Sequence, residues 1–261
     1  VYAPAFNTIE CIKSIMSTYN RDDVNSPDWY MCETLPNIMS HCGYSTAWIS
    51  NQSSSGVFDN IATRYSELCD TACFVGNKMK GMGKTDFDED VLPKLQIFNG
   101  GGKHFIIVHL MGSHFKYAMR YPSNFNINTK NNYPELKESQ RDIIASYDNS
   151  IIYNDYVVNE IFKFFEYKEA LVLYFSDHGQ DLFDSSENYF GHAIIGNPKS
   201  ETAALQIPFL VYMSPLFREK FPQTSDWIRD KKDEPLNTSN TIDFLCNILN
   251  IQYYTLGRED F

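Results

Sequence analysis

The fold is best predicted from Leu171-Val172-Leu173-Tyr174-Phe175-Ser176-Asp177-His178-Gly179, in which an apolar run leads directly into a carboxylate, an imidazole and a glycine. A continuous apolar run of this length is typical of a strand covered on both faces of a parallel sheet. In open α/β sheets, ligands bind just beyond the carboxyl ends of the strands. We therefore expect a buried strand over 171–175, followed by a ligand site at Asp177 and His178. A simple polar turn is the alternative interpretation of Asp-His-Gly taken alone.

Three further apolar runs have the same character and indicate the rest of the sheet. They cover 44–50, 105–108 and 207–213. Apolar residues recur near a 3.6-residue spacing over 135–165, which predicts a long helix between two of the strands. Strand, helix and strand in succession indicate an α/β fold with a mainly parallel central sheet sandwiched by helices. We expect a single domain over 1–261, shorter helices over 57–68 and 241–249, and an Asn-rich surface loop over 122–133.

The composition argues against two classes of protein. The formal net charge is −11, whereas nucleic-acid binding relies on an excess of Lys and Arg, so no nucleic acid is expected as the main partner. With 43% hydrophobic residues and no low-complexity run, the chain is not a disordered one. The sequence has no apolar stretch of about 18 residues, the length that spans a bilayer. We expect a soluble unit, of the kind that a longer anchored protein contains.

Histidines gather at the ends of the predicted strands. The run over 105–108 leads into His109-Leu110-Met111-Gly112-Ser113-His114, and Gly191-His192 follows later. With His178, these are four of the six histidines. Imidazole and carboxylate together suit a borderline cation such as Zn²⁺ or Mn²⁺. We expect a site built from these groups, with His109 serving only as a hydrogen-bonded structural residue.

Thr8 lies at the start of a predicted helix whose apolar face includes Ile12, Ile15 and Met16. A threonine in this position commonly caps the helix. The functional alternative is a phosphate carried by Thr8, because the amino end of a helix stabilises bound anions. Both interpretations are open at this point.

The six cysteines include two close pairs, Cys32 with Cys42 and Cys69 with Cys73. A zinc site at the second pair would need another such pair nearby. Loop disulfides in an exported protein are therefore favoured, with buried free thiols as the alternative. A buried thiol is expected for Cys246, which lies in an apolar helix.

Taken in order, these motifs make nearly the whole chain resemble the periplasmic domain of lipid A phosphoethanolamine transferases, in the alkaline phosphatase and sulfatase superfamily. Each motif alone is weak, but their common order is specific. The motifs are the helix at Thr8, Trp48-Ile49-Ser50-Asn51-Gln52, His109 to His114 with Arg120-Tyr121-Pro122, Tyr147-Asp148-Asn149-Ser150-Ile151, Ser176-Asp177-His178-Gly179, Gly191-His192 and Gln206-Ile207-Pro208-Phe209.

The resemblance implies a catalytic zinc, with Mn²⁺ less favoured, and a covalent mechanism. Thr8 matches the threonine that becomes phosphorylated and that also binds the metal. Asp177 and His178 match further ligands of the zinc. His114 and His192 match the catalytic pair that binds the transferred phosphoryl group, a second metal or the leaving oxygen.

Asn51 or Gln52 matches the loop that touches the ethanolamine phosphate. Three departures from the family's pattern stand beside these matches. The family's Glu metal ligand lies on a strand that is expected before the first residue of this sequence. Gln180 stands where many relatives have Glu. Relatives often brace the nucleophile helix with a disulfide, and the matching positions here are Pro4 and Ser14.

In function, the resemblance implies transfer of phosphoethanolamine from phosphatidylethanolamine to lipid A or to another surface glycan or protein. In the family this lipid A modification is linked to polymyxin resistance. It also implies a position at the periplasmic face of a bacterial inner membrane, reached through transmembrane helices before this domain. A phosphoglycerol transferase, a phosphodiesterase of the same superfamily and a metal-dead binding module are the competing interpretations.

Overall fold

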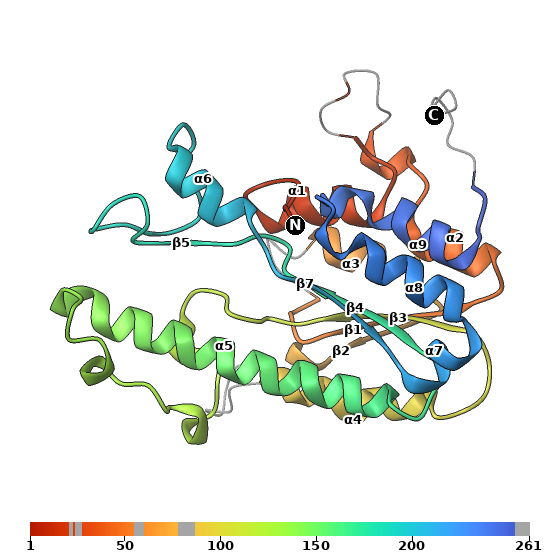
Figure 1. The fold of residues 1–261 in the computed structure, drawn as a ribbon, viewed down its shortest axis with the longest axis horizontal. Helices are drawn as coiled ribbons and strands as arrows, with labels where there is room; N and C mark the ends of the chain where they lie inside the picture. The colour runs from red at the N-terminus through yellow and green to blue at the C-terminus, as the bar shows by residue number, and fades with distance from the viewer. Residues whose placement is uncertain (21–22, 24–27, 55–59, 78–86, 254–261) are drawn as a thin grey trace.

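The computed structural model describes residues 1–20, 23, 28–54, 60–77 and 87–253, with the strands at the centre and helices on both sides (Figure 1). Three strands form a parallel sheet in the order β2-β1-β3, made of β1 (Ser45–Ser50), β2 (Thr71–Phe74) and β3 (His104–His109). In this register Ser50 lies opposite His109 and also opposite Phe74. The carboxyl ends of all three strands therefore meet at one edge.

The predicted strand over 171–175 is confirmed as β4 (Leu171–Phe175). It pairs with β7 (Phe209–Met213), which occupies most of the run predicted over 207–213 and runs antiparallel to β4. A short antiparallel pair follows β4 and consists of β5 (Asp181–Leu182) and β6 (Phe190–Gly191). The polar residues after β4 thus lead into an excursion that returns at His192.

One face of the sheet is covered by α1 (Thr8–Met16), α2 (Leu35–His41), α3 (Asn60–Ser66) and α9 (Thr241–Leu249), as Figure 1 shows. The first core cluster, on this face, includes Ile12, Met39, Trp48 and Tyr65. Trp48 points into it from β1, where successive side chains point to opposite faces. A large apolar side chain that is fully buried contributes roughly 1.5–3 kcal/mol to stability.

The opposite face is covered by the long helix α5 (Glu138–Phe165) and by α4 (Leu92–Leu95). The second core cluster, on this face, joins Ala47 and Ile49 of β1 to Leu95, Tyr153 and Val157 of the helices. Helices therefore cover both faces of the sheet; β1 is buried from Thr46 to Ser50, and the side chains of β3 are half-buried. This arrangement explains why the strands read as continuous apolar runs and confirms the predicted α/β class.

The helix predictions agree with the structure at most of their ends. Helix α5 ends at Phe165 as predicted and begins three residues after the predicted start, and α9 matches its prediction. Helix α3 covers 60–66, while residues 57–59 of the predicted helix lie outside the described part. The remaining helices are α6 (Pro198–Leu205), α7 (Pro215–Lys220), α8 (Pro222–Asp230), and the 3₁₀ helices η1 (Trp29–Met31), η2 (Val75–Asn77), η3 (Asp88–Val91), η4 (Gln96–Phe98), η5 (Tyr117–Met119), η6 (Ser123–Phe125), η7 (Lys130–Asn132), η8 (Lys231–Asp233) and η9 (Thr238–Asn240).

The Asn-rich segment over 122–133 is held more firmly than a plain surface loop. Two of its turns are η6 and η7, and much of it is exposed. Asn149 of α5 is fully buried beneath it. The Asn149 Oδ1 atom accepts hydrogen bonds from the backbone N–H groups of Ile127 and Asn128, at 3.2 and 2.8 Å. One asparagine of the helix therefore fixes the path of the segment.

The predicted loop disulfides are wrong for this structure, because Cys42, Cys69 and Cys73 are thiols. Cys69 packs against the first core cluster and Cys73 against the second. Because these side chains lie on opposite sides of the sheet, they cannot reach the short separation that a disulfide needs. Cys246 is a buried thiol in α9, as predicted. Among the described helices, none combines the length and the apolar character that a membrane span requires.

Candidate active site

Thr8 is the first residue of α1, and it does not cap the helix. Asn7 has an extended backbone and its side chain accepts a hydrogen bond from the Glu10 N–H at 3.1 Å, so Asn7 is the cap. The Thr8 hydroxyl is left to face another element. Its Oγ1 atom lies 3.4 Å from Nε2 of His178, which is 170 residues away in the sequence. Of the two alternatives for Thr8, the structure therefore removes the cap.

His178 is buried, with 7% of its surface exposed, in the turn that follows β4. Its Nδ1 atom lies 2.7 Å from the carbonyl oxygen of Gly179. The carbonyl is an acceptor only, so Nδ1 carries a proton, and in the neutral ring Nε2 then carries the lone pair. Asp177 places Oδ2 3.7 Å from the same Nε2 atom. The lone pair, a carboxylate and the Thr8 hydroxyl thus converge.

His192 completes this group from the far end of the excursion after β4. Its ring lies 4.9 Å from the ring of His178, centroid to centroid. Its Nδ1 atom is 3.1 Å from the carbonyl oxygen of Phe6, two residues before Thr8. Burial first, and then the neighbouring His178, lower the pKa of His192. The neutral imidazole is therefore favoured near pH 7.

His114 is exposed on the loop after β3 and lies at the edge of this group. Its Nδ1 atom is 2.5 Å from the carbonyl oxygen of Phe115. Its charge contributes to the lowered pKa of His192, so the two imidazoles are within electrostatic range of each other. Direct contacts link four of the predicted site residues, and His114 is linked to them only through its electrostatic effect on His192. The four are Thr8, Asp177, His178 and His192.

Asn51 and Gln52, after β1, are bonded within the protein. Asn51 is 5% exposed, and its Nδ2 atom donates to Asp88 Oδ1 at 2.8 Å. Gln52 donates through Nε2 to the Leu110 carbonyl oxygen at 3.3 Å, and the same atom lies 3.0 Å from His109 Nε2. These side chains tie the end of β1 to the end of β3.

His109 is held in the same network, as the sequence predicted. Its Nδ1 atom lies 3.1 Å from the Ser50 hydroxyl, and Gln52 occupies the other ring nitrogen. Burial lowers the pKa of His109 to about 4, while Asp177 opposes the shift. His109 is therefore neutral and hydrogen-bonded at neutral pH.

Asp88 is the residue that the sequence did not reveal. It is 3% exposed and accepts hydrogen bonds from the Asn51 amide and from the backbone N–H groups of Met111 and Gly112, each at 2.8 Å. Burial raises its pKa, while these bonds and the Arg120 charge oppose the rise. Asp88 lies in an acidic stretch with Glu89 and Asp90, which reads as a solvated turn. In the sequence, the one hint of burial near Asp88 is the apolar Val91 that follows the acidic stretch, and Val91 is buried in the structure.

The donor set around Thr8 suits zinc. A histidine whose Nδ1–H donates to a carbonyl presents Nε2 as a metal ligand, and carboxylate oxygens bind the same ion. Within the described residues, no group of three or more His, Cys, Asp and Glu side chains could hold a metal. The set here has two such residues, Asp177 and His178, and its third member is the hydroxyl of Thr8.

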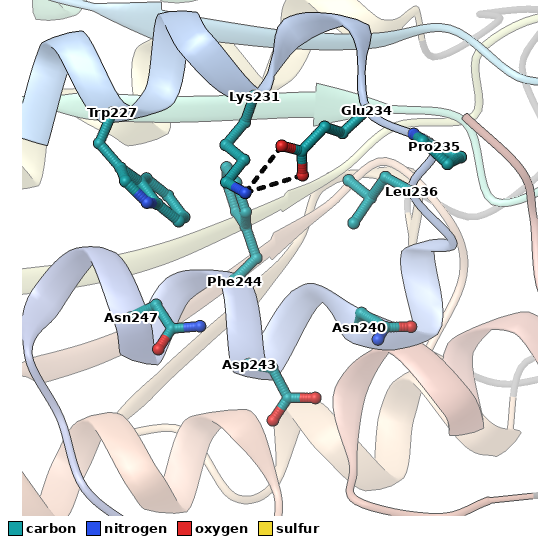
Figure 2. A pocket seen from close by; sticks show the side chains of 9 residues that line it. All are labelled: Trp227, Lys231, Glu234, Pro235, Leu236, Asn240, Asp243, Phe244 and Asn247. Carbon is teal, nitrogen blue, oxygen red and sulfur yellow. Dashed lines mark hydrogen bonds and ion pairs between the residues drawn. The ribbon is translucent and has the colours of Figure 1, made fainter. Parts of the chain in front are cut away.

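A separate cavity of about 200 Å³ lies between α8 and α9 (Figure 2). Trp227 and Phe244 line it, with their ring centroids 5.9 Å apart. Lys231 also lines it and pairs with both carboxylate oxygens of Glu234 at 2.8 Å (Figure 2). Asp243, also in the lining, accepts a hydrogen bond from the Tyr253 hydroxyl, and none of the predicted site residues lines the cavity. The cavity is therefore not the candidate active site.

Comparison with known proteins gives a consistent result. Residues 1–251 match the family model described as Sulfatase. The chain is 31% identical over 233 residues to phosphoethanolamine transferase EptC of Escherichia coli strain K12, a match that covers 86% of this chain and 39% of that protein. It is 33% identical over 220 residues to phosphoethanolamine transferase CptA of Salmonella typhimurium, covering 80% of this chain and 37% of that protein. The chain spans about two fifths of the length of these relatives.

Solved structures agree. The C-terminal periplasmic domain of EcEptC from Escherichia coli, in complex with Zn, superposes with a TM-score of 0.81 at 27% identity, covering 97% of this chain and 70% of that chain. The soluble domain of lipooligosaccharide phosphoethanolamine transferase A from Neisseria meningitidis gives a TM-score of 0.74 at 17% identity, over 95% of this chain and 75% of that chain, a likeness of fold alone. The resemblance seen in the sequence is confirmed.

Proposed function

Because this chain belongs to the sulfatase family and places Thr8 against His178, we propose that it is the catalytic domain of a phosphoethanolamine transferase. The donor is phosphatidylethanolamine, and the acceptor is an oxygen of lipid A or of another surface glycan or protein. The observation that carries the proposal is the 3.4 Å approach of the Thr8 hydroxyl to His178 Nε2 at the start of α1. The similarity to EptC and CptA supports this choice of reaction.

Thr8 is the nucleophile of a two-step transfer. Its hydroxyl oxygen attacks the phosphorus of the donor, the bond to diacylglycerol breaks, and a phosphoethanolamine-threonine intermediate forms. An acceptor oxygen then attacks the same phosphorus and releases Thr8, so one difficult transfer becomes two easier ones. The N–H groups at the amino end of α1 stabilise the negative phosphate that Thr8 carries.

Thr8, Asp177 and His178 are the residues that hold zinc in this proposal. When bound, Zn²⁺ supplies the lowering of the pKa that makes an aliphatic hydroxyl reactive near neutral pH. The Nδ1–H group of His178 donates to the Gly179 carbonyl oxygen, so the neutral ring directs its Nε2 lone pair at Thr8. Asp177 contributes the negative charge beside it.

His192 and His114 manage protons and phosphoryl charge. His192 has a lowered pKa and is neutral near pH 7, so it accepts the proton that the Thr8 hydroxyl loses and passes it to the leaving oxygen of diacylglycerol. In the second step the neutral ring accepts the proton of the acceptor and returns it to the Thr8 oxygen. His114 is assigned to the phosphoryl oxygens from the outer side of the site. The loop at Asn51 and Gln52 is assigned to the ethanolamine phosphate.

The whole protein is proposed to act at the periplasmic face of a bacterial inner membrane, with a membrane region before this domain. The relatives support this placement, since EptC has a C-terminal periplasmic domain. Phosphatidylethanolamine is a membrane lipid, so a membrane-attached enzyme would meet its donor directly.

Mass spectrometry of the Thr8 peptide tests the proposal. We expect wild-type protein, exposed to phosphatidylethanolamine with zinc, to gain one phosphoethanolamine group on this peptide, and Thr8→Ala to gain none. Asn7→Ala is the matched control, because it removes the cap of α1, at about 1 kcal/mol, but keeps the hydroxyl. An adduct on another residue, or full transfer by Thr8→Ala, would contradict the covalent route.

A further inference from the structure

Gln180 uses both ends of its side-chain amide. Its Oε1 atom accepts a hydrogen bond from the Tyr117 hydroxyl, and its Nε2 atom donates to the Ser113 carbonyl oxygen at 3.3 Å. Tyr117 is 3% exposed, and burial raises its pKa, so the phenol keeps its proton and remains a donor. The Ser113 carbonyl oxygen only accepts, so the amide nitrogen must face it, and Oε1 is left to accept from the Tyr117 hydroxyl.

These two bonds join the loop after β3 to the turn after β4, and the two strands belong to different sheets. Within the described sheets, β3 pairs with β1, whereas β4 pairs with β7. Gln180 follows Asp177 and His178 in the turn after β4. In the loop after β3 it bonds Ser113 and Tyr117, which precede and follow His114 in the sequence. The side chain therefore connects two parts of the site that are not connected by those ladders.

The far end of this connection is anchored on α5. The ring of Tyr117 meets the ring of Tyr147 edge to face, with centroids 5.1 Å apart and planes at 80°. Tyr117 therefore cannot move toward a different partner without losing its packing. A carboxylate at position 180 would accept from Tyr117, but its second oxygen would face the Ser113 carbonyl oxygen with no hydrogen to donate.

We propose that Gln180 is a positioning residue, whose amide fixes the His114 loop against the turn that carries Asp177 and His178. This role rests on the proposed function of the site, but the order of the His114 loop can be measured without the reaction. The amide suits this place because it accepts from Tyr117 and donates to Ser113, whereas an ionised carboxylate only accepts.

Hydrogen exchange and kinetics of Gln180→Glu in the full-length protein test this role. Gln180→Glu keeps the acceptor for Tyr117 and loses the donor to Ser113. We expect amide exchange in the peptide over 111–120 to become about tenfold faster, the effect of one lost hydrogen bond. For transfer from phosphatidylethanolamine, we expect kcat to fall about tenfold and KM to change less than twofold. Zinc content should not change.

Two further variants separate positioning from general loosening. Tyr117→Phe should speed exchange in the same peptide, and the double variant should exchange faster than either single variant, because each substitution removes a different bond of Gln180. Gln140→Glu is the matched control: Gln140 is buried, accepts from Lys137 N–H at 3.1 Å and donates to the Glu187 carbonyl oxygen at 3.0 Å. It should leave exchange over 111–120 at the wild-type rate.

The outcomes are distinguishable. Wild-type exchange in Gln180→Glu, or equally fast exchange in Gln140→Glu, would overturn the positioning role. A loosened loop with unchanged kcat would overturn its link to the reaction. A wild-type protein that transfers nothing, with the loop still loosened in Gln180→Glu, would refute the proposed function and leave the structural connection established.

Discussion

Two clusters of polar side chains follow strands in this protein, and they differ in how they satisfy their polar atoms. After β1 and β3, His109 has a partner at each ring nitrogen, and Asp88 accepts from three donors. After β4, the His178 Nε2 atom meets the Thr8 hydroxyl and an acidic oxygen at 3.4 and 3.7 Å, distances that are long for strong bonds. The first cluster satisfies these groups internally and leaves the buried Asn51 Oδ1 atom without a partner. The second presents a lone pair, a carboxylate and a hydroxyl to a common point.

The difference teaches that a polar residue at a strand end is a weak sign of function until its partners are known. Both clusters contain histidine beside a buried strand, and the sequence shows both equally. The arrangement after β4 brings a hydroxyl, a carboxylate and two imidazoles together. The predictions below set matched residues of the two clusters against each other.

The largest effect is expected from replacing His178 and His109 in separate variants. His178→Gln should lower transfer by at least about 10³-fold, because a group that acts on the nucleophile is lost. His109→Gln should keep most of the activity and lower the free energy of unfolding by about 1–3 kcal/mol, through its lost hydrogen bonds. Steady-state kinetics and urea unfolding of both variants measure the pair. Equal losses of activity would remove the distinction between the clusters.

The next effect concerns Asp88. Asp88→Ala should lower the free energy of unfolding by roughly 2–4 kcal/mol, because it leaves the Asn51 amide and the N–H groups of Met111 and Gly112 without their acceptor. Asp90→Ala, two residues along the same turn, is the control and should change stability by less than about 0.5 kcal/mol. Urea unfolding followed by circular dichroism provides both values. A stable Asp88→Ala protein would show that the first cluster does not depend on its carboxylate.

A pH effect of intermediate size follows from His109. Its pKa is about 4 in the folded protein, against 6.5 for an ordinary histidine. Between these pH values the unfolded chain binds a proton at His109 and the folded chain does not. Stability from this group is complete above pH 6.5 and is lost as pH falls toward 4. Between pH 7 and 5 we expect a loss of about 2 kcal/mol.

His109→Gln should remove that part of the pH dependence, whereas Gln180→Glu should retain it. Urea unfolding of wild type and both variants at pH 7 and 5 makes the comparison. If His109→Gln shows the full wild-type loss between the two pH values, another group is responsible.

The sequence predicted the layers of the fold better than the contacts of the site. Continuous apolar runs located β1, β3, β4 and β7, because burial on both faces leaves no alternation to obscure the pattern. The antiparallel direction of β7 was not visible, since a short apolar run carries no sign of direction. The disulfides failed because Cys69 and Cys73 are close along the chain but lie on opposite faces of the sheet.

Within the site, motif order indicated Thr8, Asp177, His178 and His192, and the structure places these side chains together. Of the two interpretations of Thr8, the cap is excluded because Asn7 holds that position; both are good capping residues, and only the backbone angles separate them. Asp88 was not predicted because its role is to accept hydrogen bonds from residues far away in the sequence, and a local acidic stretch does not reveal such partners.

The smallest predicted effect concerns Gln52, which belongs to the first cluster but is assigned to the ethanolamine phosphate. Its amide bonds the Leu110 carbonyl oxygen and lies beside His109, so contact with a donor lipid would require it to exchange one of these partners. That exchange lowers the net gain from binding, as a donor atom already satisfied in the free protein contributes little. Gln52→Ala should therefore raise KM for phosphatidylethanolamine only about threefold and leave kcat unchanged. Steady-state kinetics over a range of donor concentrations, beside Gln140→Ala as a control, measure this. An unchanged KM with lowered stability would assign Gln52 wholly to the structural cluster, and the headgroup would then be recognised from the Thr8 side alone.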